Sequence, residues 1–395
     1  MDDKKGITDI DGRDNRSMIP YGHQSVDEDD IRAVVGVLKS EYLTQGPAVE
    51  AFEKALAAYC GARHAVVFSS GTAALHGTYF AAGLKTGDEF ITSPLTFVAT
   101  ANAGLYLGAR PVFADVDARG NLDPEAAEAK ITKKTTLISV VDYGGHPANL
   151  HAFKKLAKRH RLVLVEDACH SLGATLRGKR IGGIADMTVF SFHPVKSITT
   201  GEGGAVLTNN KRYADALRMF RTHGITKDAA LLKRKPEGAW YYEMQQLGFN
   251  YRLTDIQSAL GLSQLKKIDR FMALRRSIAA RYAKELKDFQ KVLQLPTEGK
   301  GASSSWHLYP VRLREVFAKK RAEVFAQLRA AGIWCQVHYI PVYLQPYYQK
   351  LGYKKGLCPI AEAFYASEIS IPIFPGLSKD DQAHVIKTLR TILTA

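Results

Sequence analysis

Two residues of this chain, Asp167 and Lys196, have the types and surroundings that covalent cofactor chemistry requires. Asp167 closes an apolar run that begins at Leu162, and Lys196 lies between a second apolar run and the glycine-rich stretch 201–204. A lysine amine forms a Schiff base with the aldehyde of pyridoxal phosphate, and a carboxylate keeps the pyridine nitrogen of that cofactor protonated. An acid that closes a buried strand needs a partner, so the pair predicts a pyridoxal phosphate site.

A turn of small residues supplies a second part of such a site. Ser69 and Ser70 precede Gly71, Thr72 and Ala73, where an apolar run gives way to a helical pattern. The N–H groups at the start of a helix bind phosphate, and neighbouring hydroxyl groups assist them. The same residues also suit an ordinary helix cap, so the turn alone leaves both interpretations open.

Four further side chains are candidates because they lie near these positions in the sequence. Ser191, just before the lysine, is another hydroxyl donor for a phosphate. Phe97 either stacks on a planar ring or packs in the core. His170 either hydrogen-bonds a ring hydroxyl or caps a helix, and His193 either tunes the lysine or packs. Each becomes a site candidate only in combination with the acid and the lysine.

The hydrophobic pattern predicts an α/β fold. Short β-rich runs alternate with helical patterns, and repeated strand–helix units indicate a mostly parallel sheet with helices on both faces. Ligands of such sheets bind beyond the carboxyl ends of the strands, where the acid and Ser191 fall. The seven runs are 65–68, 89–92, 111–116, 136–141, 162–166, 187–192 and 204–207.

The remaining segments complete the predicted organisation. Residues 1–17 read as a flexible polar tail, 18–270 as a large domain and 271–395 as a smaller α/β domain. Near the start, Ser25 and Glu28 have capping-box spacing before a helical stripe, and a second helix follows. Later elements are a long helix at 254–286, strands at 306–313 and 333–339, a helix ending at Gly332, and a last helix. The stripes of the first two helices comprise Ile31, Val34, Val35 and Leu38, then Val49, Phe52, Leu56 and Tyr59.

Composition excludes several classes of protein. The net charge is +15, but the basic residues are scattered and accompany no nucleic-acid-binding motif, so we expect no nucleic-acid partner. No run approaches the roughly 18 apolar residues of a membrane helix, and the N-terminus lacks the apolar core of a signal peptide. We therefore expect a cytoplasmic protein. The four cysteines form no CxxC pair, so we predict neither a metal site nor a disulfide framework.

Together these motifs resemble the DegT/DnrJ/EryC1/StrS family of pyridoxal-phosphate-dependent sugar aminotransferases. The resemblance runs from about Ile19 to the C-terminus and implies the fold type I architecture, with a mostly parallel seven-stranded sheet and a smaller C-terminal α/β domain. The chain departs from the family in the segment before Gly71, which has Ser69 and Ser70 where relatives often carry an asparagine. This difference affects a contact with the cofactor but leaves the groups that bind its phosphate in place. The matching segments are 43–47, 71–75, 96–102, 166–170, 191–204 and 248–255.

The resemblance also implies a role for each matching residue. Lys196 and Asp167 are the catalytic pair, and a homodimer shares its active sites because Asn250 reaches the cofactor phosphate of the partner subunit. The implied cofactor-binding set is Thr72, Ala73, Phe97, Asp167, His170, Ser191, Lys196 and Asn250. The implied substrate contacts are Thr44, Gln45, His193, Arg252, His338 and Tyr339.

Segments 220–226, 240–242 and 337–342 are similar to the branch of the family that serves pseudaminic-acid synthesis. This similarity implies transfer of an amino group from L-glutamate to the C4 ketone of a UDP-linked 4-keto-6-deoxy-N-acetylhexosamine. The alternatives are a dTDP-linked sugar, a C3 ketone, a sugar dehydratase and a non-catalytic binding protein. The dehydratases carry histidine where this chain has Lys196, and a non-catalytic protein predicts loss of the lysine or the acid. Segment 201–204 lacks the GxGxxG pattern of a nicotinamide enzyme.

Overall fold

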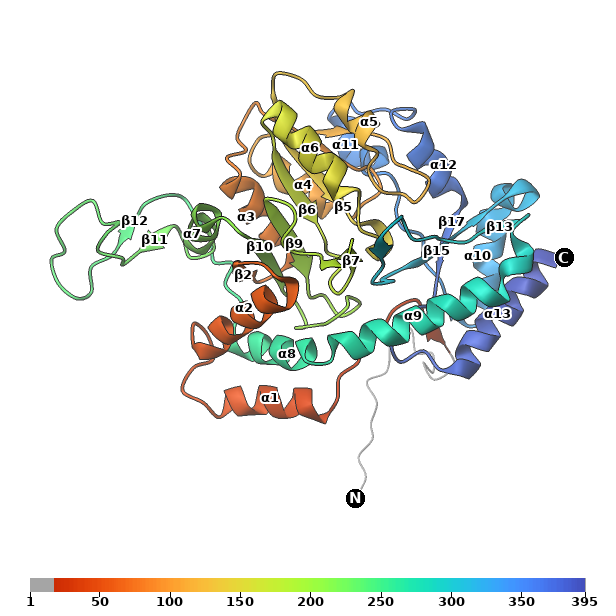
Figure 1. Ribbon diagram of the computed structural model, residues 1–395, viewed down its shortest axis with the longest axis horizontal. Coiled ribbons are helices and arrows are strands. Elements are labelled where there is room, and N and C mark those ends of the chain that lie inside the picture. Colours follow the sequence, from red (N-terminus) through yellow and green to blue (C-terminus); the bar gives the residue numbers. More distant parts are fainter. Residues whose placement is uncertain (1–17, 395) are drawn as a thin grey trace.

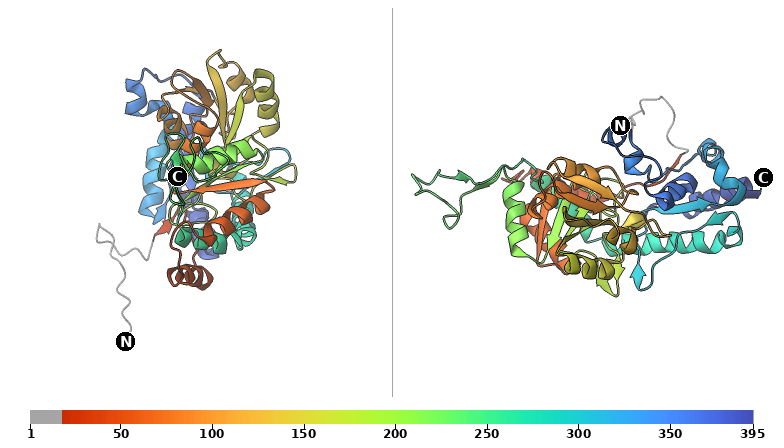
Figure 2. Two further views of the ribbon diagram at one scale, coloured as in Figure 1. Left: turned by 90° about the vertical axis from the view of Figure 1, so that its left-hand side faces the viewer. Right: turned by 90° about the horizontal axis from the view of Figure 1, so that it is seen from above.

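The computed structural model describes residues 18–394, so the expected tail at 1–17 lies outside the described residues. Its centre is a seven-stranded sheet covered by helices on both faces (Figures 1 and 2). All seven predicted strands are confirmed, with small shifts at their ends. β10 runs antiparallel to both neighbours, and the other pairs are parallel. In spatial order the strands are β2 (His64–Phe68), β10 (Gly204–Thr208), β9 (Met187–Ser191), β6 (Val163–Asp167), β5 (Thr135–Val141), β3 (Glu89–Thr92) and β4 (Arg110–Phe113).

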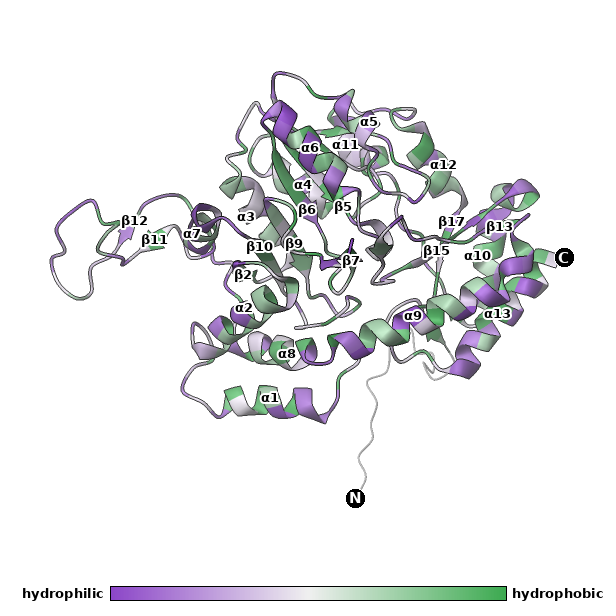
Figure 3. Ribbon diagram, viewed as in Figure 1, coloured by the Kyte–Doolittle hydropathy of each residue, from purple (hydrophilic) through white to green (hydrophobic). Residues whose placement is uncertain are grey.

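The sequences of these strands are continuously apolar because both faces of the sheet are buried. In β2, Ala65 and Val67 face one hydrophobic cluster, whereas Val66 and Phe68 face another. Figure 3 shows the hydrophobic residues concentrated on the central strands. The first cluster takes side chains from α2 (Pro47–Cys60), α5 (Pro124–Glu128), α6 (Leu150–His160) and α8 (Asp255–Leu265), and the second from α3 (Gly71–Ala81), α4 (Ala99–Leu105) and α7 (Lys211–Phe220).

A further cluster forms in the C-terminal part of the chain around a three-stranded antiparallel sheet. Helix α9 (Ile268–Glu285) joins the two regions, since Phe271 belongs to the large cluster and Tyr282 to the C-terminal one. The division at residue 270 stays a prediction. The remaining elements here are β13 (Leu293–Gln294), β15 (Tyr309–Leu313), α10 (Arg321–Ala330), α11 (Pro346–Lys350), α12 (Pro359–Ser367), β17 (Glu368–Ile371) and α13 (Lys379–Thr394).

Three expected elements differ from the structure. The helix expected over 254–286 is divided into α8 and α9 at Lys266 and Lys267. The strand expected from residue 306 begins only at Tyr309, because Trp306 has a left-handed φ of 51°. The strand expected over 333–339 is reduced to β16 (Ile333–Trp334), which pairs with β1 (Ile19–Pro20). The residues that follow β16 leave the sheet and line a cavity described below.

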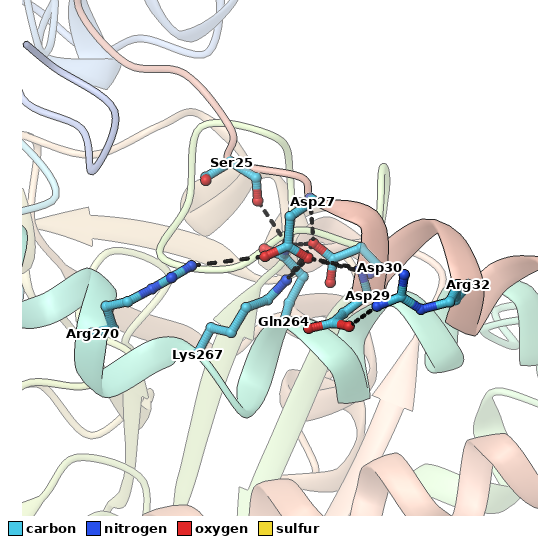
Figure 4. Close-up of polar contacts among 8 residues, drawn as sticks. All are labelled: Ser25, Asp27, Asp29, Asp30, Arg32, Gln264, Lys267 and Arg270. Carbon is cyan, nitrogen blue, oxygen red and sulfur yellow. Dashed lines mark hydrogen bonds and ion pairs between the residues drawn. The ribbon is translucent and has the colours of Figure 1, made fainter.

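Helix α1 (Glu28–Leu38) is held by polar contacts, and its predicted apolar stripe is largely uncovered. Ile31 and Leu38 are about half exposed, at 47% and 55%, whereas Asp30 is fully buried. The helix is capped by Asp27, two residues beyond the serine expected to cap it. Figure 4 shows Lys267 between Asp27 and Asp30, with its Nζ 2.6 Å from an oxygen of each. The stripe therefore remains available for contact with another molecule.

Residues 222–250 form a long excursion from the body of the protein (Figures 1 and 2). It carries the hairpin β11 (Ile225–Thr226) and β12 (Glu243–Met244), which pair antiparallel. Trp240 and Leu247, in this excursion, are 72% and 70% exposed. Exposed apolar groups of this size are common where a protein contacts another molecule.

Candidate active site

A cavity of about 680 Å³ lies at the carboxyl ends of three neighbouring parallel strands. The last residues of β5, β6 and β9 are Val141, Asp167 and Ser191, and all three line it. This is where an α/β sheet binds ligands, because the strand ends and following loops converge there. The volume falls in the range of small-molecule sites, which runs from roughly 300 to 1,000 Å³.

Asp167 is held in the cavity wall by two hydrogen bonds to its carboxylate. Thr100 Oγ1 donates to Oδ2 at 2.6 Å, and the Cys169 N–H donates to Oδ1 at 3.2 Å. The side chain is buried, at 4% exposure. These bonds orient the carboxylate without a basic partner among the described ion pairs. A buried carboxylate in this state favours a cationic group of a ligand.

Lys196 lines the same cavity from the loop that follows β9. The loop is closed by backbone hydrogen bonds from Phe192 to Gly203 and from Thr200 back to Phe192, and the Lys196 N–H donates to His193. Burial lowers the pKa of the lysine amine below its ordinary value, while nearby Cys169 and Asp167 oppose that shift. A lowered pKa increases the fraction of neutral amine, which is the form that acts as nucleophile and base.

The start of helix α3 forms a cradle beside these residues. Ser70 caps the helix by accepting the Ala73 N–H at 3.1 Å, so Ala73 is occupied internally and lies outside the cavity lining. Gly71 and Thr72 line the cavity, and the first N–H groups of a helix have no acceptor within it. A Cβ at Gly71 would lie 3.0 Å from that of Ser191, so a side chain there would force Ser191 to shift by a few tenths of an ångström.

Imidazole and phenol groups form another wall. His170 Nε2 lies 3.1 Å from the Tyr339 hydroxyl, and the rings of His170 and His307 are 4.3 Å apart. Burial is the main cause that lowers the pKa of both histidines well below the ordinary value. Both rings are therefore neutral at physiological pH and act as hydrogen-bonding groups rather than charges.

The structure brings together nine of the fourteen predicted site residues. The cavity is lined by Thr72, Phe97, Asp167, His170, Ser191, His193, Lys196, His338 and Tyr339, whereas Ala73, Thr44, Gln45, Asn250 and Arg252 lie outside its lining. Thr44 forms a bridge with Thr254, and Asn250 forms one with Thr222 at the base of the excursion. The individual roles of all these residues stay predictions.

Tyr21, Thr100 and His307 are among the residues of the wall that sequence reasoning missed. Thr100 stands four residues after Thr96, and the two hydroxyl groups are 2.7 Å apart. Thr96 lies in the loop before α4 (Ala99–Leu105), so helical spacing does not explain this contact. Tyr21 and His307 come from distant parts of the chain and have no local signal.

The cavity fits pyridoxal phosphate on the chemistry of its walls. A lysine amine with lowered pKa, an oriented carboxylate, and a helix start with a neighbouring hydroxyl face one space. These groups match the aldehyde, the pyridine nitrogen and the phosphate. Within residues 18–394, no group of three or more side chains has the arrangement of a metal site, and no helix has the length and apolarity to cross a membrane.

Comparisons of the sequence and of the structure with known proteins agree with each other. The sequence is 42% identical over 390 residues to UDP-4-amino-4,6-dideoxy-N-acetyl-beta-L-altrosamine transaminase of Campylobacter jejuni strain 81-176, covering 95% of this chain and 98% of that protein. It is 40% identical over 381 residues to the Bacillus subtilis spore coat polysaccharide biosynthesis protein SpsC, covering 95% and 97%. The structure is similar to that of Helicobacter pylori PseC, an aminotransferase of pseudaminic acid biosynthesis, with a TM-score of 0.90, 37% identity and coverage of 95% and 99%.

The Streptococcus pneumoniae protein Spr1654, named as a sugar aminotransferase and solved in its pyridoxamine phosphate form, superposes with a TM-score of 0.90 at 30% identity and coverage of 95% and 99%. Residues 24–390 match the DegT/DnrJ/EryC1/StrS aminotransferase family. The fold and cavity are those of an aminotransferase that uses pyridoxal phosphate. The chain belongs to the DegT/DnrJ/EryC1/StrS family.

Proposed function

We propose that this aminotransferase moves the amino group of L-glutamate to the C4 ketone of a UDP-linked 4-keto-6-deoxy-N-acetylhexosamine. The observation that carries the chemistry is that Lys196, Asp167 and the start of α3 face one cavity. The similarity to named transaminases of 4-amino UDP-sugars supports the substrate. A dTDP-linked sugar or a C3 ketone is the alternative.

In this proposal Lys196 has two tasks. Its neutral amine would hold the cofactor covalently, and the free amine would take the proton from the α-carbon of glutamate. Pyridoxal phosphate, when bound, supplies an aldehyde that takes up amino groups and a ring that accepts electron density. Water consumed in the first half-reaction releases 2-oxoglutarate, and the ketone oxygen of the sugar leaves as water in the second.

The other residues orient the reactants. Asp167 would hold the protonated pyridine nitrogen, while Thr72 and Ser191 would hold the phosphate at the start of α3. Phe97, which lines the cavity and is 60% exposed, would stack on the ring. Holding both reactants against one amine removes much of the entropic barrier.

The substrate assignment predicts a selective product. Purified enzyme with L-glutamate and a panel of UDP- and dTDP-linked 4-keto and 3-keto sugars is expected to aminate the UDP 4-keto-N-acetylhexosamine fastest. Mass spectrometry and NMR of the product identify the carbon that carries nitrogen. Faster turnover of a dTDP sugar, or nitrogen at C3, refutes the substrate while leaving the aminotransferase class intact.

We further propose a homodimer in which each subunit completes the site of the other. Asn250 is exposed and lies outside the cavity of its own chain, at the base of the excursion that carries Trp240. The uncovered stripe of α1 adds apolar surface. A two-fold dimer covers both surfaces and brings Asn250 to the cofactor phosphate of the partner subunit.

Shared sites predict complementation between two inactive variants. Lys196→Ala and Asn250→Ala are each expected to lose most activity, but mixed subunits contain one site with both native residues. After refolding or co-expression, the mixture is expected to regain up to roughly a quarter of wild-type activity, since half of the sites in half of the dimers are native. A mixture that stays as inactive as its components, although mass spectrometry shows mixed dimers, contradicts the shared site.

A further inference from the structure

A buried carboxyl group connects to the cavity through two short contacts. Glu368 is fully buried at the start of β17, and its Oε1 lies 2.5 Å from Ser370 Oγ. Ser370 Oγ lies 2.9 Å from His338 Nδ1. Because His338 lines the cavity, the three side chains form a continuous chain from the protein interior to the substrate space.

The backbone of His338 is held by the same environment. Its N–H donates to Glu368 Oε2 at 2.7 Å, and its carbonyl accepts the Tyr143 hydroxyl. Since Nδ1 is engaged by Ser370, Nε2 is the ring nitrogen that remains for a ligand. The position of the ring is therefore set, and what it presents to a ligand depends on where its proton resides.

The protons on Glu368, Ser370 and His338 can be arranged in two ways. Ser370 has a single hydroxyl proton, and its hydroxyl contacts only Glu368 and His338 among the described residues, so the proton serves one of these contacts and the other takes a proton from its partner. In the first arrangement Glu368 is protonated and donates to Ser370, which donates to His338 Nδ1; Nε2 then carries a proton. In the second, Nδ1–H donates to Ser370, which donates to ionised Glu368; Nε2 then has only a lone pair.

Burial favours the first arrangement at neutral pH. It raises the pKa of Glu368 to about 8, although Ser370, the His338 N–H and the more distant Arg321 oppose the shift. Arg321 donates instead to the Tyr365 carbonyl. The other titratable groups that face this carboxyl or its strand are Tyr143, Cys335, Tyr339 and, across from it on β15, Arg312. Burial also lowers the pKa of His338 to about 3, so its ring holds one proton.

We propose that Glu368 is a positioning residue of the active site: through Ser370 it fixes His338 in the tautomer whose Nε2–H donates to an acceptor oxygen of the substrate. That oxygen is the sugar ketone or the carboxylate of the amino donor, since both are acceptors. The inference rests on the proposed function only for the identity of the sugar.

Substitutions at Glu368 separate the two arrangements. The amide of Glu368→Gln accepts the His338 N–H and donates to Ser370, so it holds the donor tautomer at every pH. We expect kcat/KM of Glu368→Ala and Ser370→Ala to fall by about 10–100-fold, as for other residues that orient an active group. Glu368→Gln should keep most of the wild-type kcat/KM at pH 7. In wild-type holoenzyme, kcat/KM should fall above pH 8 as Glu368 ionises, and this fall should be absent in Glu368→Gln.

Measuring the two half-reactions separately identifies the acceptor oxygen. A loss confined to the L-glutamate half-reaction, followed by the visible spectrum, assigns the oxygen to the amino donor; a loss confined to the sugar half-reaction assigns it to the sugar. The matched control is Glu362→Gln on α12, whose carboxyl accepts from Tyr343 outside the cavity lining and whose variant should keep the wild-type pH profile. If the wild-type enzyme accepts no UDP sugar, the proposed function is wrong. The role of Glu368 can still be tested, because the rate of the L-glutamate half-reaction can be compared between the variants.

Stability gives a readout that does not depend on turnover. Glu368 keeps its proton in the folded protein between its ordinary pKa of 4.5 and about 8, whereas the unfolded chain loses it, so wild-type stability falls as pH rises through that window. Glutamine does not titrate, so the melting temperature of Glu368→Gln relative to wild type should rise from about pH 5 to pH 8 and then level off. A flat difference, or Glu368→Gln as inactive as Glu368→Ala, overturns the proposal. Wild-type activity in Ser370→Ala overturns it as well.

Discussion

Replacing Lys196 with alanine is expected to lower turnover by at least ~10³-fold in both half-reactions, because one amine is both the covalent anchor and the base. The visible absorption band of the cofactor-loaded enzyme should be lost or shifted at the same time. The half-reactions are measured by stopped-flow absorbance with L-glutamate and by product mass with the sugar. An unchanged band in the variant contradicts the assignment of Lys196.

The same variant should fold normally. Burial disfavours the charged form of the Lys196 amine, so its removal is expected to leave the melting temperature of the cofactor-free protein unchanged or slightly higher. A matched control is Lys211→Ala on α7, whose exposed amine pairs with Asp215 at 2.6 Å and should leave turnover unaffected. Partial recovery of Lys196→Ala by added methylamine would show that an amine, and not the fold, is what the variant lacks.

The strands were predictable from sequence because each is buried on both faces. A short apolar run rich in β-branched residues, such as Val163–Val165, suits the interior of a parallel sheet, so its assignment depends little on distant contacts. The position of Asp167 followed from the same run. Placing an acid at the end of a central strand fixes its location at the ligand-binding edge, which is where the cavity lies.

Helix α1 shows where local patterns stop being sufficient. Its apolar stripe has the period of a buried helix, yet Ile31 and Leu38 are exposed while Asp30 is buried against Lys267. A single sequence does not say whether an apolar face packs within its own chain or against another copy. The helix is capped by Asp27 and not by the expected Ser25 for a related reason. The Asp27 carboxylate also pairs with Lys267, which lies 240 residues away in the sequence.

The cavity wall that contains His307 and Tyr339 was harder to predict than the sheet. His307 and Tyr339 come from the C-terminal part of the chain, where the strand expected over 333–339 breaks after Trp334. Glu368 and Ser370 lie two residues apart in a short strand, with nothing in their local pattern to suggest a contact with His338. Such contacts depend on tertiary packing between segments about thirty residues apart, which periodicity does not report.

The second large effect is expected from Asp167→Asn. The substitution keeps the size of the side chain but removes the negative charge that opposes the positive pyridine nitrogen. Loss of one such electrostatic partner lowers turnover on the order of 10²–10³-fold, so we expect kcat to fall by that factor with a smaller change in KM. Steady-state kinetics at saturating sugar and glutamate measure this directly.

The hydrogen bonds around Asp167 make this variant a clean test. The asparagine oxygen still accepts the Cys169 N–H, and its amide donates to Thr100, whose hydroxyl turns to donate to Thr96 at 2.7 Å. The variant should therefore melt within a few degrees of wild type, since no buried polar group is left unpaired. Thr100→Val is the matched control: it removes the hydroxyl that contacts Asp167 and Thr96 but keeps the charge of Asp167, so its kcat should fall far less. Equal losses in the two variants would mean that orientation of the carboxylate, and not its charge, sets the rate.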